Sequence, residues 1–266
     1  MKKNNSLIGK PQLLLILIFT ILFSILYFGL DRKPKKQALV ENSRAANAEV
    51  TDPTILIREA KELLKDEQAA YIQVLESDLR SNQDDPQPIL ESLAARWFEA
   101  GYPAISGYYA EEIAKLLNTE EAWSIAGTTF TMALKGENSE KVRAYCSQHA
   151  LSAFEKTISL SPDNVDHRIN QALVYIDYPA KDNPMKGIQM LLGLKDKYPE
   201  NASVLIQLGR LAIGTRQYER AIERLNTALT IDKDNDKANC LLAQAYQATG
   251  DIVNARLFND KCLQKI

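Results

Sequence analysis

The chain has 266 residues, of which 45% are hydrophobic and 25% are charged, and its formal net charge is −2. This composition is typical of a globular protein and excludes a largely disordered chain. Seven basic residues and one acidic residue lie within residues 1–36, so the rest of the chain is acidic and unsuited to nucleic acid, whose phosphates require clustered lysine and arginine.

The most apolar segment is residues 11–30, PQLLLILIFTILFSILYFGL, which contains no charged residue. As a helix it would be about 30 Å long, which matches the hydrocarbon core of a bilayer. The segment therefore predicts a transmembrane anchor that follows a basic N-terminal tail, residues 1–10. A cleaved signal peptide is the alternative, but the nearest small-x-small site, Ala46-Asn47-Ala48, lies well beyond the apolar stretch.

The orientation of this anchor is less clearly encoded, because basic residues flank it on both sides and nearly balance the positive-inside rule. A short tail with three lysines is a poor candidate for export. We therefore expect the N-terminus inside and the rest of the chain outside the cytoplasm.

Residues 31–52 are polar and have no periodic apolar face, which predicts a tether. A juxtamembrane helix is predicted over residues 53–86, starting after the Asp52-Pro53 cap and broken by the Ser81–Pro88 stretch. Its apolar stripe, at mostly three- and four-residue spacing, is Ile57, Ala60, Leu64, Tyr71, Val74 and Leu75. This stripe either packs on the following domain or mediates self-association.

The C-terminal part of the chain repeats itself every 34 residues. Leu208-Gly209 realigns with Leu242-Ala243, Ala221 with Ala255, and Ala228 with Cys262. A period of this length with small residues at set places indicates a solenoid of helix-turn-helix units. Such a solenoid offers a surface for another chain rather than a catalytic cavity.

The pattern resembles the tetratricopeptide repeat. The segment 202–235 carries Leu208-Gly209 at repeat positions 7 and 8, Ala221 at 20 and Ala228 at 27. The resemblance extends to units 236–266, 165–201 and 121–164, and more weakly to 87–120, so that 87–266 is the predicted solenoid. It implies an all-α fold of antiparallel helix pairs, in which positions 8 and 20 face each other and must be small.

The resemblance also implies a partner-binding groove along the first helix of each unit. Carried over position by position, the groove residues are Ser124, Thr128, Thr131, Ile169, Leu173, Ile176, Ile206, Arg210, Ile213, Gln244 and Gln247. An apolar centre with polar ends and one cation suits an amphipathic helix or an extended apolar peptide. The alternative occupant is the chain's own 54–80 helix.

Residues that could carry chemistry are few. The two histidines, His149 and His167, lack neighbours at metal-ligand spacing, and no nucleotide-binding, hydrolase or zinc motif is present. No catalytic, cofactor-binding or metal residue is therefore predicted, and we do not expect an enzyme. Cys146, Cys240 and Cys262 form an odd set without a CxxC pair, which predicts buried reduced thiols.

The architecture resembles that of small bacterial repeat proteins with an N-terminal anchor. It implies a scaffold or adaptor in the inner membrane, with a periplasmic domain that binds a protein or peptide partner during assembly or quality control of envelope proteins. Two alternatives are a structural oligomer, joined through residues 54–80 and the C-terminal end, and an inert auxiliary subunit of a membrane enzyme.

Overall fold

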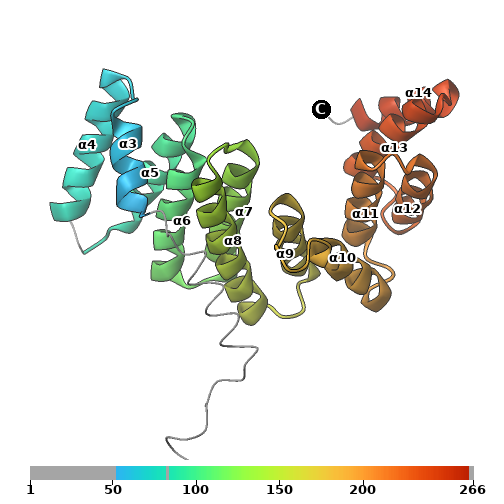
Figure 1. The fold of residues 1–266 in the computed structure, drawn as a ribbon, viewed down its shortest axis with the longest axis horizontal. Helices are drawn as coiled ribbons and strands as arrows, with labels where there is room; N and C mark the ends of the chain where they lie inside the picture. Colours follow the sequence, from blue (N-terminus) through green and yellow to red (C-terminus); the bar gives the residue numbers. More distant parts are fainter. Residues whose placement is uncertain (1–51, 82–83, 264–266) are drawn as a thin grey trace, which may run out of the picture. The chain divides into compact units, whose positions relative to one another are not determined.

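The computed structural model describes residues 52–81 and 84–263 (Figure 1). The basic tail, the predicted anchor at 11–30 and nearly all of the tether lie outside these residues. Within the described residues, twelve α-helices and no strand are present, which confirms the predicted all-α class. None of these helices combines the length and apolarity that a bilayer crossing requires.

Ten of the described helices form five consecutive pairs, one in each predicted repeat unit. The pairs are α5 (Gln87–Glu99) and α6 (Pro103–Leu117), α7 (Glu120–Gly136) and α8 (Glu140–Leu160), α9 (Val165–Asp177) and α10 (Lys186–Lys197), α11 (Ala202–Gly214) and α12 (Tyr218–Ile231), and α13 (Asp236–Thr249) and α14 (Ile252–Leu263). The two helices of each pair pack on each other, and each second helix packs on the first helix of the next pair. The repeats therefore form a solenoid.

Three of the first helices begin with the same device. Asn164, Asn201 and Asn235 are in extended backbone conformation and precede α9, α11 and α13. Their side-chain oxygens accept hydrogen bonds from the amides of Asp166, Val204 and Ala238, at 2.9–3.0 Å. Each cap satisfies a backbone donor that the helix cannot pair internally, so the start of each first helix is fixed by one asparagine.

The predicted juxtamembrane helix is in fact two helices, α3 (Pro53–Lys61) and α4 (Asp66–Ser81). The break at residues 62–65 lets α3 pack on α6 and α4 pack on α5. Ala60 and Ile72 are buried there in one cluster with Trp97. The stripe predicted for this segment is wrong at Tyr71 and Val74 of α4, which are exposed, whereas Leu75 packs against this cluster as predicted. Ile72, which the stripe left out, is buried.

These packing partners also bear on the proposed occupant of the groove. Since α3 and α4 contact α6 and α5, the 54–80 segment does not fill a groove along α9, α11 and α13 in the described structure. The alternative in which the chain occupies its own groove is therefore wrong for this conformation.

Small residues permit the closest helix crossings. A Cβ on Gly187 of α10 would overlap the carbonyl oxygen of Ala172 in α9 and would lie 2.7 Å from Cγ1 of Ile176. This contact confirms the predicted facing of positions 8 and 20 in the unit 165–201. Glycines at position 8 have a further role, because a Cβ on Gly127 or Gly209 would lie within 2.8 Å of Phe154 or Leu225 side-chain atoms.

Replacement of Gly187 with alanine is expected to lower the free energy of unfolding by about 1–3 kcal/mol, because a backbone oxygen cannot move away as a side chain can. Gly193 of the same helix is the matched control, since a Cβ there meets no atom within 4 Å. Gly193→Ala should be neutral or stabilise by up to about 1 kcal/mol through better helix propensity. Urea unfolding followed by circular dichroism measures both. Equal shifts for the two variants would contradict the close crossing.

The cysteines differ from the prediction in part. Cys240 of α13 and Cys262 of α14 form a disulfide, with their Cα atoms 4.9 Å apart, so the expectation of reduced thiols is wrong for this pair. Cys146 is a free, buried thiol, as predicted, and burial raises its pKa to about 12. The disulfide joins the two helices of the last pair.

Candidate partner-binding groove

The first helices α7, α9, α11 and α13 are consecutive neighbours. α9 contacts both α7 and α11, and α11 contacts α13 (Figure 1). All eleven predicted groove residues lie on these four helices. The solenoid therefore brings together residues that are more than a hundred positions apart in the sequence.

On α7, the predicted residues are two threonines. Thr128 is exposed and donates its hydroxyl proton to the carbonyl oxygen of Ser124 at 2.8 Å. Thr131 is half-buried and donates to the carbonyl oxygen of Gly127 at 2.7 Å. Both hydroxyls keep acceptor capacity for a partner.

On α9 and α11, the apolar residues divide into two groups. Ile169 and Ile206 are buried in the core, so their side chains are not available to a partner in this conformation. Leu173, Ile176 and Ile213 are half-buried, packing against the core with part of their surface in solvent. Partial exposure is what an apolar contact surface needs, so these three form the centre of the groove.

The α11–α13 side of the groove is polar and positively charged. Arg210 donates from Nε to the Gln207 side chain at 3.0 Å, and Gln244 and Gln247 of α13 are exposed. Desolvation by the surrounding protein lowers the pKa of Lys237 below its ordinary value, and the positive charges of Arg210 and Lys135 lower it further. Cations from three first helices therefore share one electrostatic environment.

Two exposed apolar residues of α7 were missed by the sequence reasoning. Ile125 and Met132 are both exposed and lie seven residues apart, with the exposed Thr128 between them. This spacing places all three on one face of the helix. The seven-residue spacing was visible in the sequence, and it extends the apolar part of the groove onto α7.

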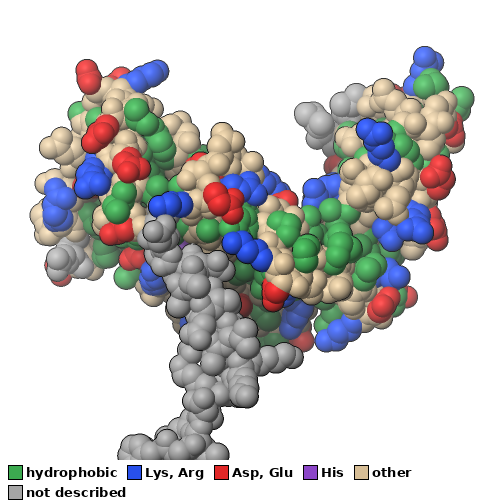
Figure 2. All heavy atoms as spheres, in the orientation of Figure 1, with side chains coloured by type: hydrophobic (Ala, Val, Ile, Leu, Met, Phe, Trp, Pro, Cys, Tyr) green, Lys and Arg blue, Asp and Glu red, His purple; other side chains and the backbone are tan. Residues whose placement is uncertain are grey.

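Over α9 and α10, apolar side chains gather beside Lys and Arg side chains on the face shown in Figure 2.

A set of polar contacts fixes α7, α8 and α9 relative to one another. Lys135 of α7 pairs with the carboxylate of Asp177 of α9 at 3.5 Å. Arg143 of α8 donates to the carbonyl oxygens of Leu134 at 2.9 Å and Asp177 at 3.0 Å. These contacts cross the longest hairpin of the solenoid and hold the α7–α9 side of the groove.

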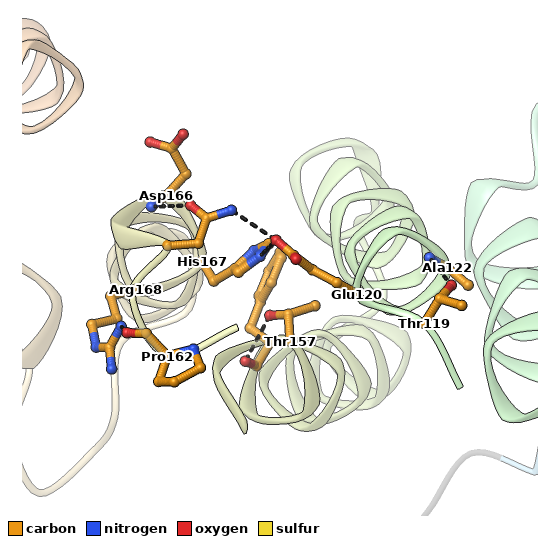
Figure 3. A network of polar contacts seen from close by, with 10 residues as sticks. Thr119, Glu120, Ala122, Thr157, Pro162, Asp166, His167 and Arg168 are labelled. Carbon is orange, nitrogen blue, oxygen red and sulfur yellow. Dashed lines mark hydrogen bonds and ion pairs between the residues drawn. The ribbon is translucent and has the colours of Figure 1, made fainter. Parts of the chain in front are cut away.

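Each of the two histidines contacts a glutamate carboxylate on another helix. His167 is buried, and its Nε2 lies 2.6 Å from a carboxylate oxygen of Glu120, which also accepts from Asn164 at 2.8 Å (Figure 3). His149 contacts the buried carboxylate of Glu111. Among the described residues, no group of three His, Cys, Asp or Glu side chains could hold a metal ion.

Glu111 is the most deeply buried carboxylate of these contacts. Burial alone would raise the pKa of its carboxyl group, but the hydrogen bond with His149 and the positive charge of Lys115 outweigh burial and hold this pKa below its ordinary value. The His149 ring also lies 4.2 Å from the Tyr145 ring and 5.2 Å from the Phe130 ring, measured between centroids. The pair therefore links α6 to α8 beside the core.

Repeated antiparallel helix pairs, capped at regular intervals and aligned along their first helices, define an α-solenoid of the kind that presents a surface to other chains. Residues 217–250 match a family model described as "TPR repeat". The match covers α12 and α13, which are the second helix of one unit and the first helix of the next. The resemblance to the tetratricopeptide repeat is thus confirmed.

Several solved structures are similar to the chain at low identity. "Crystal structure of MamA protein" has 16% identity and a TM-score of 0.39, covering 67% of this chain and 91% of that one. "MamA 41-end from Desulfovibrio magneticus RS-1" has 18% identity and a TM-score of 0.40, covering 69% and 96%. "Crystal structure of YrrB: a TPR protein with an unusual peptide-binding site" has 13% identity and a TM-score of 0.36, covering 71% and 90%. No curated protein matches the sequence.

Proposed function

We propose that this protein is a non-enzymatic scaffold that binds a segment of a partner protein along α7, α9, α11 and α13. The observation that carries the proposal is the row of partly exposed apolar side chains on neighbouring first helices, of which Leu173, Ile176 and Ile213 form the centre. Partly exposed apolar side chains bury more of their surface when a second apolar surface covers them, and this burial stabilises the complex. An amphipathic helix or an extended peptide fits such a row.

The charges indicate the chemistry of the partner. Desolvation is the largest cause of the lowered pKa of Lys237, and the positive charge of Arg210 adds to it, so two like charges act on each other at the α11–α13 side of the groove. A carboxylate placed between them would relieve this repulsion and form charge-assisted hydrogen bonds. The preferred partner segment is therefore apolar in its middle and acidic where it meets these two residues.

The proposed location is the outer side of a bacterial inner membrane, with residues 11–30 as the anchor. Two features support it, namely the uncharged apolar stretch of 11–30 and the Cys240–Cys262 disulfide, since disulfides persist in oxidising compartments. In this location the scaffold would serve assembly or quality control of envelope proteins. A C-terminal reporter that is active only outside the cytoplasm tests the location, and an inactive reporter together with a stable fusion would refute it.

Site-specific photocrosslinking in cells tests the groove. A photoreactive residue at Leu173 or Gln244 should give one discrete adduct, whereas the same residue at the exposed Glu155 or Glu223 of the second helices should not. Arg210→Glu should lower the yield of that adduct about tenfold or more, because it removes a charge-assisted contact and adds a repulsive one. Adducts of equal yield at all four positions, or an adduct indifferent to Arg210→Glu, would argue against binding in the groove.

A further inference from the structure

The last described helix of the solenoid, α14, carries exposed apolar side chains. Each earlier second helix packs on the first helix of the following pair, as seen for α6, α8, α10 and α12. Among the described helices, α14 packs extensively on α13 alone. Val253 of α14 is 80% exposed, and Ile252 and Leu257 are exposed as well. The residues 34 positions before Val253 and Leu257 are Glu219 and Glu223 of α12, and both are exposed, so α14 is apolar at an outer face where the preceding unit is charged.

Basic residues accompany the apolar residues on α14. Arg256 and Lys261 are exposed, and they follow Val253 and Leu257 at three- and four-residue spacing. Residues at these spacings lie on one side of a helix. The outer face of α14, consisting of Val253, Arg256, Leu257, Asp260 and Lys261, is therefore apolar and carries two basic residues and one acidic residue.

The first part of the described chain carries a face of the opposite charge. On α4, Val74 is 57% exposed and Tyr71 is also exposed, and the acidic residues Glu67 and Asp78 lie four residues before Tyr71 and four after Val74. The extensive contact of α4 among the described helices is with α5, so this side of α4 is open. Tyr71 is partly shielded by Arg96, whose guanidinium lies 4.9 Å from its ring.

We propose that copies of this chain associate end to end, with the outer face of α14 in one copy packed on the Glu67–Asp78 face of α4 in the next. Both faces have an apolar centre, and their flanking charges are complementary. Pairing of two α4 faces would bring acidic residues together, and pairing of two α14 faces would bring together two faces of net positive charge, so charge favours the unlike pair. This contact differs from the groove.

Association through two different faces has a distinct physical consequence. A head-to-tail contact does not close after two copies, so it builds rings or open chains whose mass increases with concentration. Light scattering on the full-length protein in detergent micelles should therefore show a mass that grows with protein concentration. A mass of one chain at every concentration would refute the proposal.

Charge exchange tests the pairing itself. Arg256→Glu should weaken the association about tenfold or more, because like charges then face each other. The double variant Arg256→Glu with Glu67→Lys should restore it, since the two substituted charges are again opposite. Unchanged association of Arg256→Glu, or failure of the double variant to recover while its circular dichroism spectrum is unaltered, would overturn the assignment of these faces.

Crosslinking distinguishes head-to-tail pairing from the symmetric alternatives. A Val74→Cys chain with one tag and a Val253→Cys chain with another are mixed and treated with a short bismaleimide, which leaves the Cys240–Cys262 bond intact. We expect the mixed product to predominate over either same-variant product. A dominant product between two Val74→Cys chains would overturn the proposal, and Glu223→Cys mixed with Val253→Cys is the negative control. The groove residues are unchanged throughout, so failure here leaves the proposed scaffold function untouched.

Discussion

Replacement of Phe130 with alanine is expected to lower the free energy of unfolding by about 3–5 kcal/mol, which is the usual cost of deleting a fully buried aromatic ring. Phe130 of α7 is completely buried. A Cβ on Gly107 of α6 would lie 2.7 Å from its ring, and the Tyr145 ring of α8 lies 5.7 Å away between centroids. One ring therefore joins three helices, and its loss leaves a cavity that rigid neighbouring backbones cannot fill.

Phe98→Ala is the matched control for Phe130→Ala. Phe98 lies on α5 and is 45% exposed, so its removal should cost about 1 kcal/mol or less. Chemical denaturation of both variants, with comparison of midpoints and slopes, measures the difference. Similar losses for the two variants would mean that Phe130 does not occupy the joint between α6, α7 and α8.

Removal of the Cys240–Cys262 disulfide is expected to lower the free energy of unfolding by about 3 kcal/mol, as estimated from the closure of a loop of this size. The two cysteines are 22 residues apart, and no side chain described in α14 is buried. The last helix therefore depends on the covalent link more than on burial. The double variant Cys240→Ser with Cys262→Ser should show this loss of unfolding free energy. Addition of a reducing agent should not lower the stability of the double variant further.

Cys146→Ala is the control for the disulfide prediction, because it removes the free thiol and keeps the bond. Its thermal midpoint should fall on addition of reducing agent, as in the unaltered protein. Thiol titration of the unfolded, unreduced protein adds a direct check. We expect one reactive thiol per chain, and three reactive thiols would show that the bond does not form.

The repeat region was predictable because its packing is local and periodic. Small residues such as Gly127 and Gly209 recur at the same repeat position, and large residues such as Phe154 and Leu225 recur where they fill the space beside these glycines. Each helix contacts mainly its neighbours in the sequence, so a pattern with a period of 34 contains most of the information about the fold.

The predictions were wrong where the apolar spacing within one helix does not determine which of its faces is buried. Apolar spacing alone did not reveal the break at residues 62–65, and it assigned Tyr71 rather than Ile72 to the interior of α4. Similarly, the family's groove positions include Ile169 and Ile206, which face the core here. Which side of a helix is covered depends on its neighbours, and these are set by the tertiary structure.

The cysteines illustrate a different limit. Cys240 and Cys262 occupy positions in two helices that come together only after α13 and α14 fold back on each other. An odd number of cysteines without short spacing argues against pairing when read from sequence alone. The hairpin geometry, and not the spacing, brings this pair within bonding distance.

The position of this bond also affects how the chain responds to proteolysis. Cys240 and Cys262 lie on either side of the turn at Gly250, an exposed residue with a φ of 83°. A protease that cuts once in this turn leaves two fragments that remain covalently joined, so the nick is visible on a gel only after reduction. The disulfide therefore keeps α14 and its outer face attached after a cleavage that would release this helix from a solenoid without the bond.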